Sequence, residues 1–319
     1  GGGMLIMFQI QVINIAVSFL GNVALYDNFS RSQGGAYVAD LGVHYVSNYH
    51  CKFVSNRAAK YGAGSCNMFT KMAHFKYCVF QNNNGKWQGG GLWFSDVGWV
   101  IVEFCTFIQN VAGNEGSALF ILKTNYSQIA FCTFKSNVHA INGSGLTVHT
   151  GYSLSIHNIK FVNSTSVRKG GAVYIFSIKY VVIFYGCFIN NTVVNLGGAI
   201  GIYHSINLEI ANTIFINNTA ALGGGIHSVD ILNITLSNVT YNRNQAKHGG
   251  ALLFKCIKVL NISNCKFYNN FCKISGGAMG VTFSANVYTE IHDSVFIRNT
   301  AELGGALFFD TTGSLIHTN

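Results

Sequence analysis

The sequence predicts an all-β fold, a right-handed parallel β-helix with three strands and about 27 residues per coil. Two landmarks that recur along the chain, one aromatic and one glycine, support this prediction independently. A fixed period of about 20 to 50 residues is typical of a solenoid, in which each repeat covers the open edges of its neighbours. No segment shows the roughly 3.6-residue period of an amphipathic helix, which a leucine-rich horseshoe would need in every repeat.

The aromatic landmark sets the period. Ten steps from Tyr26 to Phe296 cover 270 residues, which gives a mean spacing of 27. Its members are Tyr26, Phe53, Phe80, Phe107, Phe134, Phe161, Phe188, Phe215, Tyr241, Phe267 and Phe296. The glycine landmark gives the same spacing. Its members are Gly34, Gly62, Gly89, Gly116, Gly143, Gly170, Gly197, Gly223, Gly249, Gly276 and Gly304.

The first strand of each coil is expected to follow the glycine landmark. The landmark and the next two positions carry only Gly, Ala or Ser in all eleven repeats. The backbone is therefore expected to turn tightly there or to approach another segment closely. Apolar residues then alternate, as at Ile200 and Ile202. A period of two predicts a strand with this face directed inward.

The second strand is predicted from alternating apolar pairs such as Leu208 and Ile210. It is expected to end in a bend where this alternation breaks, at Asn158, Asn212, Asn238 and Asn264. The third strand carries the landmark aromatic and ends three residues later at an Asn. Asn tolerates turn conformations, and we expect its stacked side chains to hydrogen-bond along a structural column. The column consists of Asn56, Asn83, Asn110, Asn137, Asn191, Asn218, Asn244, Asn270 and Asn299.

The whole chain, residues 1–319, is predicted to be one continuous β-helix domain of roughly 11–12 coils. Parallel crossover connections are overwhelmingly right-handed. A coil spacing of about 4.8 Å gives a rod on the order of 55 Å long. Because residues 1–6 already fit the glycine landmark and the chain stops inside a coil after Phe309, we expect a fragment of a longer protein.

Two tetrapeptides alternate along the chain. GGA followed by an aliphatic residue or Met begins at Gly170, Gly197, Gly249, Gly276 and Gly304. FxxN begins at Phe53, Phe80, Phe107, Phe134, Phe188, Phe215, Phe267 and Phe296. This alternation resembles the repeats of the chlamydial polymorphic outer-membrane proteins (Pmp), and it is also similar to repeats of assorted eukaryotic extracellular β-helix proteins. The resemblance implies a secreted or cell-surface β-helix with an adhesive role.

The distribution of charged and apolar residues restricts the classes of partner that the protein is expected to bind. The net charge is +9, but the Lys and Arg residues occupy different coil positions, which argues against a nucleic-acid groove. Attraction to an acidic polysaccharide or to a membrane surface is left open. The apolar stretch from Met4 to Leu20 is interrupted by Gln9, Gln11 and Asn14 in strand-like alternation, so we expect no transmembrane segment in this fragment.

Five cysteines stand two residues before the landmark aromatic and are expected to form an inward column: Cys51, Cys78, Cys105, Cys132 and Cys265. We favour free thiols that pack in the core. Disulfides between adjacent coils are the alternative, since a spacing of about 4.8 Å falls within the permitted Cα range. None of the nine cysteines has zinc-ligand spacing, and we predict no metal and no cofactor.

Nine Asn-x-Ser/Thr sequons are candidates for glycosylation of a secreted chain. They are Asn28, Asn125, Asn142, Asn163, Asn190, Asn217, Asn233, Asn238 and Asn261.

The sequence predicts no catalytic residues. Parallel β-helices that cleave polysaccharides bring acid and base carboxylates together on stacked strands. The eleven carboxylates here occupy scattered coil positions; Glu209, for example, is flanked by Val182 and Thr235 on the neighbouring coils. The residues before the landmark aromatic are too irregular for an ice-binding Thr array. A binding surface is instead expected on the outer side of the first strand, at Trp93, Phe120, Tyr174, Leu253 and Phe308.

These observations favour an extracellular structural or adhesive β-helix without catalytic activity. Its expected partners are further copies stacked end to end in a filament, or the rest of a longer parent chain, together with a carbohydrate or cell-surface ligand. The alternative is a carbohydrate-binding β-helix or a carbohydrate-active enzyme similar to pectate lyase.

Overall fold

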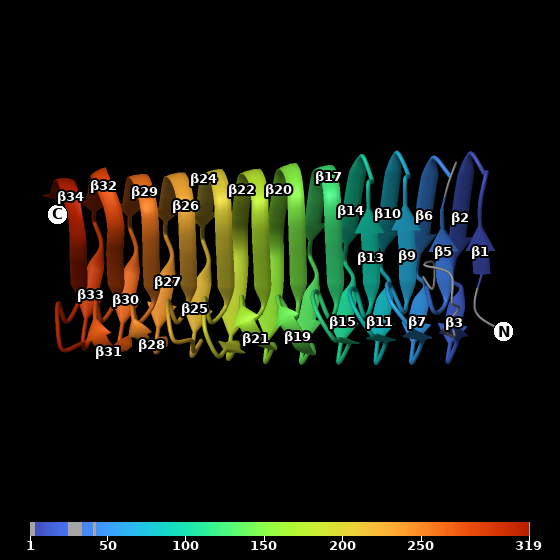
Figure 1. The fold of residues 1–319 in the computed structure, drawn as a ribbon, viewed down its shortest axis with the longest axis horizontal. Coiled ribbons are helices and arrows are strands. Elements are labelled where there is room, and N and C mark those ends of the chain that lie inside the picture. The colour runs from blue at the N-terminus through green and yellow to red at the C-terminus, as the bar shows by residue number, and fades with distance from the viewer. Residues whose placement is uncertain (1–3, 25–33, 41–42, 319) are drawn as a thin grey trace.

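The computed structural model describes residues 4–24, 34–40 and 43–318, which form strands and no helix. The strands pair in parallel between coils about 27 residues apart, so the predicted parallel β-helix is confirmed (Figure 1). Register shows the spacing directly: Leu92 pairs with Leu119, and Leu119 pairs with Leu146. The coils near the C-terminal end are slightly uneven, because Ile200 pairs with Ile226 but Met279 pairs with Leu307.

Each coil begins with a first strand after the glycine landmark. In chain order these strands are β1 (Met4–Ile6), β5 (Tyr37–Ala39), β9 (Ser65–Met68), β13 (Leu92–Ser95), β17 (Leu119–Ala130), β20 (Leu146–Val162), β22 (Val173–Ile189), β24 (Ile200–Ala211), β26 (Ile226–Ser237), β29 (Leu252–Ser263), β32 (Met279–His292) and β34 (Leu307–Thr318). From β17 onward this strand continues through the next corner and includes the second strand.

The second strand is separate only in the first coils. There it forms β2 (Gln11–Ile15), β6 (Tyr45–Tyr49), β10 (Met72–Lys76) and β14 (Trp99–Glu103). The third strand carries the landmark aromatic, and in β20 and β22 it also merges with the strand before it. Elsewhere it forms β3 (Ser18–Leu20), β7 (Lys52–Val54), β11 (Val79–Gln81), β15 (Thr106–Ile108), β18 (Thr133–Lys135), β25 (Ile214–Ile216), β27 (Thr240–Asn242), β30 (Lys266–Tyr268) and β33 (Val295–Ile297).

The corner before the glycine contains a fourth, short strand that the sequence did not predict. It forms β4 (Val23–Ala24), β8 (Arg57–Ala58), β12 (Asn84–Gly85), β16 (Val111–Ala112), β19 (Val138–Asn142), β21 (Thr165–Lys169), β23 (Thr192–Val193), β28 (Gln245–His248) and β31 (Phe271–Ser275). These strands form their own ladders beside the main sheet of the first three.

Single residues in left-handed conformation make the corners. The predicted bend after the second strand is confirmed, since Asn158 and Asn212 have φ values of 49° and 50°. The glycine landmark is also left-handed, as at Gly197 with a φ of 71°. At the corner after the third strand the left-handed residue is the one before the predicted Asn; Asn217, with a φ of 55°, precedes Asn218.

The landmark aromatics form one continuous stack in the core. Successive ring centroids lie 4.5 Å (Phe134–Phe161) to 5.2 Å (Phe161–Phe188) apart, with nearly parallel planes. One prediction was wrong: the ring stacked on Phe53 is Phe19, at 5.0 Å. Tyr26, which was predicted there, lies outside the described residues. The FxxN motif that begins at Phe19 was missed because the first coil is longer, with Met4 pairing to Tyr37.

Candidate functional site

The nine predicted Asn residues lie in one column, where each side chain joins neighbouring coils. At Asn218 the Nδ2 atom donates to Asn244 Oδ1 and to the Phe188 carbonyl, both at 3.0 Å. The Asn218 Oδ1 atom accepts from the backbone N–H and the Nδ2 of Asn191, again at 3.0 Å. Asn22 extends the column at its N-terminal end, because Asn22 Nδ2 donates to Asn56 Oδ1 at 2.9 Å. The column is therefore a hydrogen-bonded spine inside the protein.

Ser164 interrupts this spine. Its backbone N–H donates to Asn191 Oδ1 at 3.0 Å, but its own Oγ is buried without a hydrogen-bond partner. Asn137 Nδ2 donates to the Phe107 carbonyl at 3.0 Å, yet it faces no amide oxygen on the next coil because serine has none. One coil thus separates two runs of Asn side chains.

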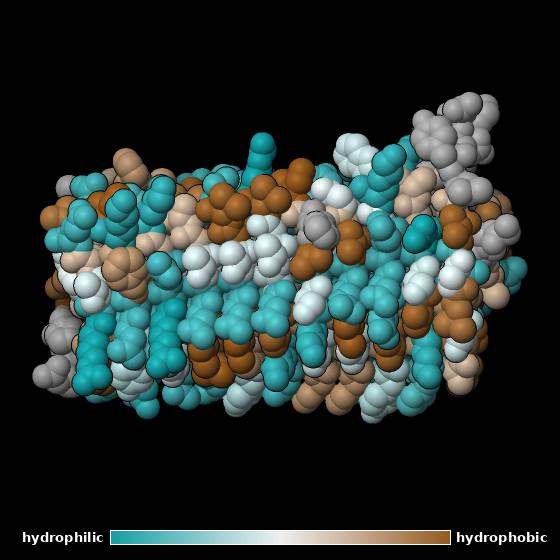
Figure 2. All heavy atoms as spheres, turned by 90° about the horizontal axis from the view of Figure 1, so that it is seen from below, coloured by the Kyte–Doolittle hydropathy of each residue, from teal (hydrophilic) through white to brown (hydrophobic). Residues whose placement is uncertain are grey.

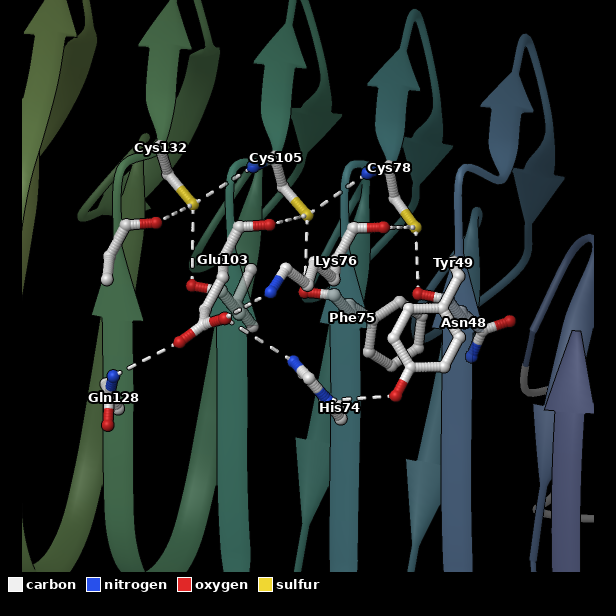
Figure 3. Close-up of polar contacts among 12 residues, drawn as sticks. Asn48, Tyr49, His74, Phe75, Lys76, Cys78, Glu103, Cys105, Gln128 and Cys132 are labelled. Atoms are coloured by element: carbon white, nitrogen blue, oxygen red, sulfur yellow. Dashed lines mark hydrogen bonds and ion pairs between the residues drawn. The ribbon is translucent and has the colours of Figure 1, made fainter. Parts of the chain in front are cut away.

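The five cysteines of the predicted column are buried and unpaired. Figure 3 shows Cys78, Cys105 and Cys132 in a row on neighbouring strands. Cys78 Sγ donates to the Asn48 carbonyl at 3.3 Å, and Cys105 Sγ accepts from the Cys78 backbone N–H at 3.4 Å. At this corner the thiols therefore form hydrogen bonds with backbone groups that do not pair with each other.

Thr213 and Ser294 occupy the same position in later coils and act in the same way. Thr213 Oγ1 accepts from the backbone N–H of Gly186, and Ser294 Oγ accepts from that of Cys265, both at 3.1 Å. The position therefore accepts a hydrogen-bonding side chain but does not require one, since other coils have Ile159, Gly186 and Val239 there.

We expect alkylation after denaturation, without reductant, to label Cys51, Cys78, Cys105 and Cys132 as free thiols. In the folded protein these buried thiols should not react, whereas the exposed Cys256 serves as a positive control. Burial also raises the pKa of Cys265 to about 11, which keeps it in the unreactive thiol form. Mass spectrometry reads out the result, and a Cys51–Cys78 linked peptide would contradict it.

Most sequons are accessible. Six Asn side chains are exposed: Asn125, Asn163, Asn190, Asn217, Asn233 and Asn238. Asn142 is half-buried and donates to Glu115 Oε1 at 2.9 Å, and Asn261 is half-buried as well. Asn28 lies outside the described residues. Figure 2 shows the side of the third strands, where a band of hydrophilic side chains runs along the rod.

The predicted binding surface on the first strand was wrong at four of its five residues, and the fifth, Phe308, is half-buried. Trp93, Phe120, Tyr174 and Leu253 are only 1–5% exposed. The corner before each glycine folds back against the outer side of this strand, so that a Cβ on Gly89 would lie 2.7 Å from Trp93 Cβ. Trp93 and Phe120 belong to a second, smaller core with Val38, Cys66 and Met68. Period-two patterning did not reveal it, because both faces of the strand are buried.

Polar groups are also enclosed in this outer core. Tyr203 Oη and His227 Nδ1 lie 3.0 Å apart, and burial, with nearby Lys255 and Lys169, lowers the pKa of His227 to about 3. Glu115 Oε2 lies 3.4 Å from His149 Nε2 and accepts from Gln88. Both pairs lie under the corners, which indicates a structural role, and His227 Nε2 is buried there without a hydrogen-bond partner.

The outer side of the second strands carries the exposed aromatic residues instead. At the start of the strand, Trp99 and Tyr126 stack at 4.2 Å, and Tyr152 and Tyr180 continue this strand-start ladder. At the far end, three exposed residues form the corner ladder that begins beside His50: Tyr77, Phe104 and Phe131. The side chains of Trp99 and Phe131 are 52% and 50% exposed.

The two ladders border one open sheet surface, which we call the aromatic-edged face. Trp99 and Phe104 are five residues apart, or about 17 Å along an extended strand. The corner ladder repeats at intervals of 27 residues, so its signal was present in the sequence but was not recognised. It lies three residues before the landmark aromatic.

A polar network lies between the ladders (Figure 3). Glu103 is 3.6 Å from Lys76 Nζ and 3.7 Å from His74 Nε2, and it accepts from Gln128 Nε2 at 3.3 Å. Tyr49 Oη lies 3.4 Å from His74 Nδ1. Burial lowers the pKa of His74, although the Glu103 carboxylate opposes the shift, so Lys76 is the cation that pairs with Glu103 at neutral pH. The network presents hydrogen-bonding groups between two apolar edges.

Two hollows adjoin the strand-start ladder. One, of about 160 Å³, is lined by Trp99, Tyr126, Gln128 and neighbouring serines. The other, of about 550 Å³, contains Lys123, Lys179 and His204 around Gly151. Lys179 Nζ lies 5.1 Å from the Tyr152 ring centroid, so the basic hollow and the ladder share residues.

No two carboxylates lie on adjacent coils on the outer side of the second strands in the part that the structure describes, where the acids are Glu103, Glu209 and Glu290. Glu209 pairs in register with Val182 and Thr235, as predicted. The described residues contain no group of three or more His, Cys, Asp and Glu side chains suited to a metal ion. Within those same ranges, no helix has the length and hydropathy needed to span a bilayer.

No family model, curated protein or solved structure matches the chain. The resemblance to the polymorphic outer-membrane proteins therefore stays a prediction.

Proposed function

We propose that this chain is an extracellular adhesive β-helix that binds carbohydrate chains on its aromatic-edged face. The observation that carries the proposal is the pair of exposed ladders on either side of a polar sheet surface. Exposed aromatic faces pack against the apolar faces of sugar rings, and the groups between them supply hydrogen bonds. Soluble proteins rarely expose such patches without a binding role.

The regular spacing of the strands supports an extended ligand. Equivalent side chains repeat about every 4.8 Å along the rod, so a polymer that lies along the axis meets the same kind of contact on successive coils. The basic hollow with Lys123 and Lys179 favours acidic substituents at the edge of the face. Asn125 lines this hollow too, so a glycan on Asn125 would occupy it.

Binding rather than cleavage fits the chemistry of the face. Glycoside hydrolysis commonly uses two carboxylates about 5–10 Å apart. Glu103 is surrounded by Lys76, His74 and Gln128 instead of a second acid. Self-association end to end, or membership of a longer chain, belongs to the same proposal, since an adhesive rod gains reach with length.

The test is binding of unglycosylated protein to an array of neutral and acidic oligosaccharides. We expect retention of extended saccharides, with acidic ones preferred, and an affinity loss of about tenfold or more in the double variant Trp99→Ala/Tyr126→Ala, since roughly 1.4 kcal/mol corresponds to tenfold. Trp87→Ala is the matched control, because Trp87 is equally exposed at 52% but lies off the face.

Two outcomes would overturn the proposal. One is the absence of saccharide binding, and the other is an equal loss in the Trp87 control. Turnover of pectin, alginate or glycosaminoglycans that Glu103→Gln abolishes would favour the enzyme alternative.

A further inference from the structure

The column of side chains on the outer side of the first strand has a gap at Gly280. Leu253, Gly280 and Phe308 pair in register on β29, β32 and β34, near the C-terminal end in Figure 1. A Cβ added at Gly280 would meet Leu253 Cδ1 at 3.0 Å, and the nearest backbone atoms would be 3.9 Å away. The gap is therefore bounded by flexible side chain and not by backbone.

The other glycine of this column, Gly201, leaves no such gap. The Tyr203 ring, two residues further along the same strand, comes within 3.4 Å of the position of a Cβ on Gly201. The residue two positions after Gly280 is Thr282, which is too small to fill the space. The two glycines differ in what bounds them, since a Cβ on Gly201 would also meet the Gly170 backbone nitrogen at 3.1 Å, whereas Gly280 is bounded by the flexible Leu253 side chain.

A cavity of about 420 Å³ is lined by Leu253 and Phe308, the two residues that flank Gly280 in register. Its walls are largely apolar and include Leu253, Leu303 and Phe308, and its polar residues are His248, Lys255, Ser275, Thr282 and Asp310. Such a volume lies within the range of about 300–1,000 Å³ that small-molecule sites occupy.

Thr282 provides a second, independent observation. Its Oγ1 atom is buried and has no hydrogen-bond partner. An unsatisfied buried hydroxyl costs free energy, so such groups normally have a partner. Thr282 and Lys255 both line the cavity, so rotation of the Thr282 side chain would bring its hydroxyl to a ligand oxygen there.

The shape of the gap selects a flat ligand. Leu253 and Phe308 are two coils apart, or roughly 9.6 Å at about 4.8 Å per coil. A planar ring midway would lie at about the spacing of the stacked rings inside this protein, such as 4.6 Å between Phe267 and Phe296. Elsewhere in the column Trp93, Phe120 and Tyr174 supply such rings from the chain itself.

We propose that this cavity binds a small planar aromatic molecule that carries an acceptor oxygen, such as a phenol or an aromatic carboxylate. The ring stacks between Leu253 and Phe308, and the oxygen accepts from the Thr282 hydroxyl within reach of Lys255. This site is independent of the aromatic-edged face, which lies on the outer side of the second strands.

The experiment is a titration of the whole chain with benzoate that is monitored by calorimetry and by methyl NMR. Cyclohexanecarboxylate, which is not planar, is titrated in the same way for comparison. We expect saturable binding of benzoate that is stronger than that of the comparator, with shifts at the Leu253 and Thr282 methyl groups. Gly280→Phe should fill the gap and weaken binding about tenfold or more. Thr282→Val should weaken it several-fold, and Gly201→Ala, the matched control, should leave it unchanged.

Failure of benzoate to saturate the site at millimolar concentration would overturn the proposal, as would unchanged affinity in Gly280→Phe. If Gly280→Phe fails to fold, Thr282→Val and the location of the methyl shifts decide. If the shifts are confined to residues away from Leu253 and Thr282, benzoate binds outside the cavity and the proposal is wrong.

Discussion

Replacement of Asn218 by leucine is expected to lower the free energy of unfolding by about 4 kcal/mol. The substitution removes four hydrogen bonds, two that Asn218 Nδ2 donates and two that its Oδ1 accepts. Leucine has a similar volume, so the loss comes mainly from buried groups left without partners, above all the backbone N–H of Asn191, while Asn191 Nδ2 keeps its bond to the Phe161 carbonyl. Urea denaturation, monitored by circular dichroism, measures the change in the free energy of unfolding.

The interruption of the Asn column at Ser164 allows the opposite change, in which an amide is added to the column. Ser164→Asn should raise the urea midpoint, because the new amide would accept from Asn137 and donate to Asn191 Oδ1, and the unpartnered serine hydroxyl would disappear. An unchanged midpoint in both variants would show that the Asn column does not stabilise the fold.

Gly198→Ala is expected to have the second large effect, a loss of about 4 kcal/mol or failure to fold. A Cβ at this position would lie 1.9 Å from the Gly224 carbonyl oxygen and 2.7 Å from the Thr219 nitrogen on the next coil. Neither backbone atom can move without breaking inter-coil hydrogen bonds, such as that from Gly198 N to Gly223 O at 3.0 Å. Overpacking therefore opens the ladder.

Gly305→Ala is the matched control for Gly198→Ala. Gly305 has the same place in the repeat, but a Cβ there would meet only the Asn299 carbonyl oxygen at an ordinary 3.4 Å. We expect it to retain the wild-type melting temperature. If the two variants are equally destabilised, close backbone approach between coils does not explain why this position of the repeat is so often glycine.

The sequence predicted the parts of the fold that repeat. Each coil presents the same environment at Ile200 or Asn218, and eleven repeats average out local exceptions. Single-coil irregularities were not predictable in the same way. The longer first coil displaced the aromatic landmark from Phe19 to Tyr26, because a count by fixed period cannot recognise an insertion.

The candidate site was less predictable than the fold. Alternation along the strand at Trp93 indicated an outward side chain correctly, but it could not show that the next corner covers that side. The exposed ladder of Tyr77, Phe104 and Phe131 has the same 27-residue spacing as the core aromatics. Periodicity alone therefore does not separate a buried stack from an exposed one; the left-handed corner turns these residues outward.

The interruption at Ser164 has a mechanical consequence. The amide spine consists of two runs, residues 22–137 and 191–299, and every link in it must be broken when a coil is peeled from the end of the rod. Each released coil adds on the order of 90 Å of extended chain. Under tension applied at the two ends, the resisting force should therefore repeat coil by coil and be lower at the coil that contains residue 164.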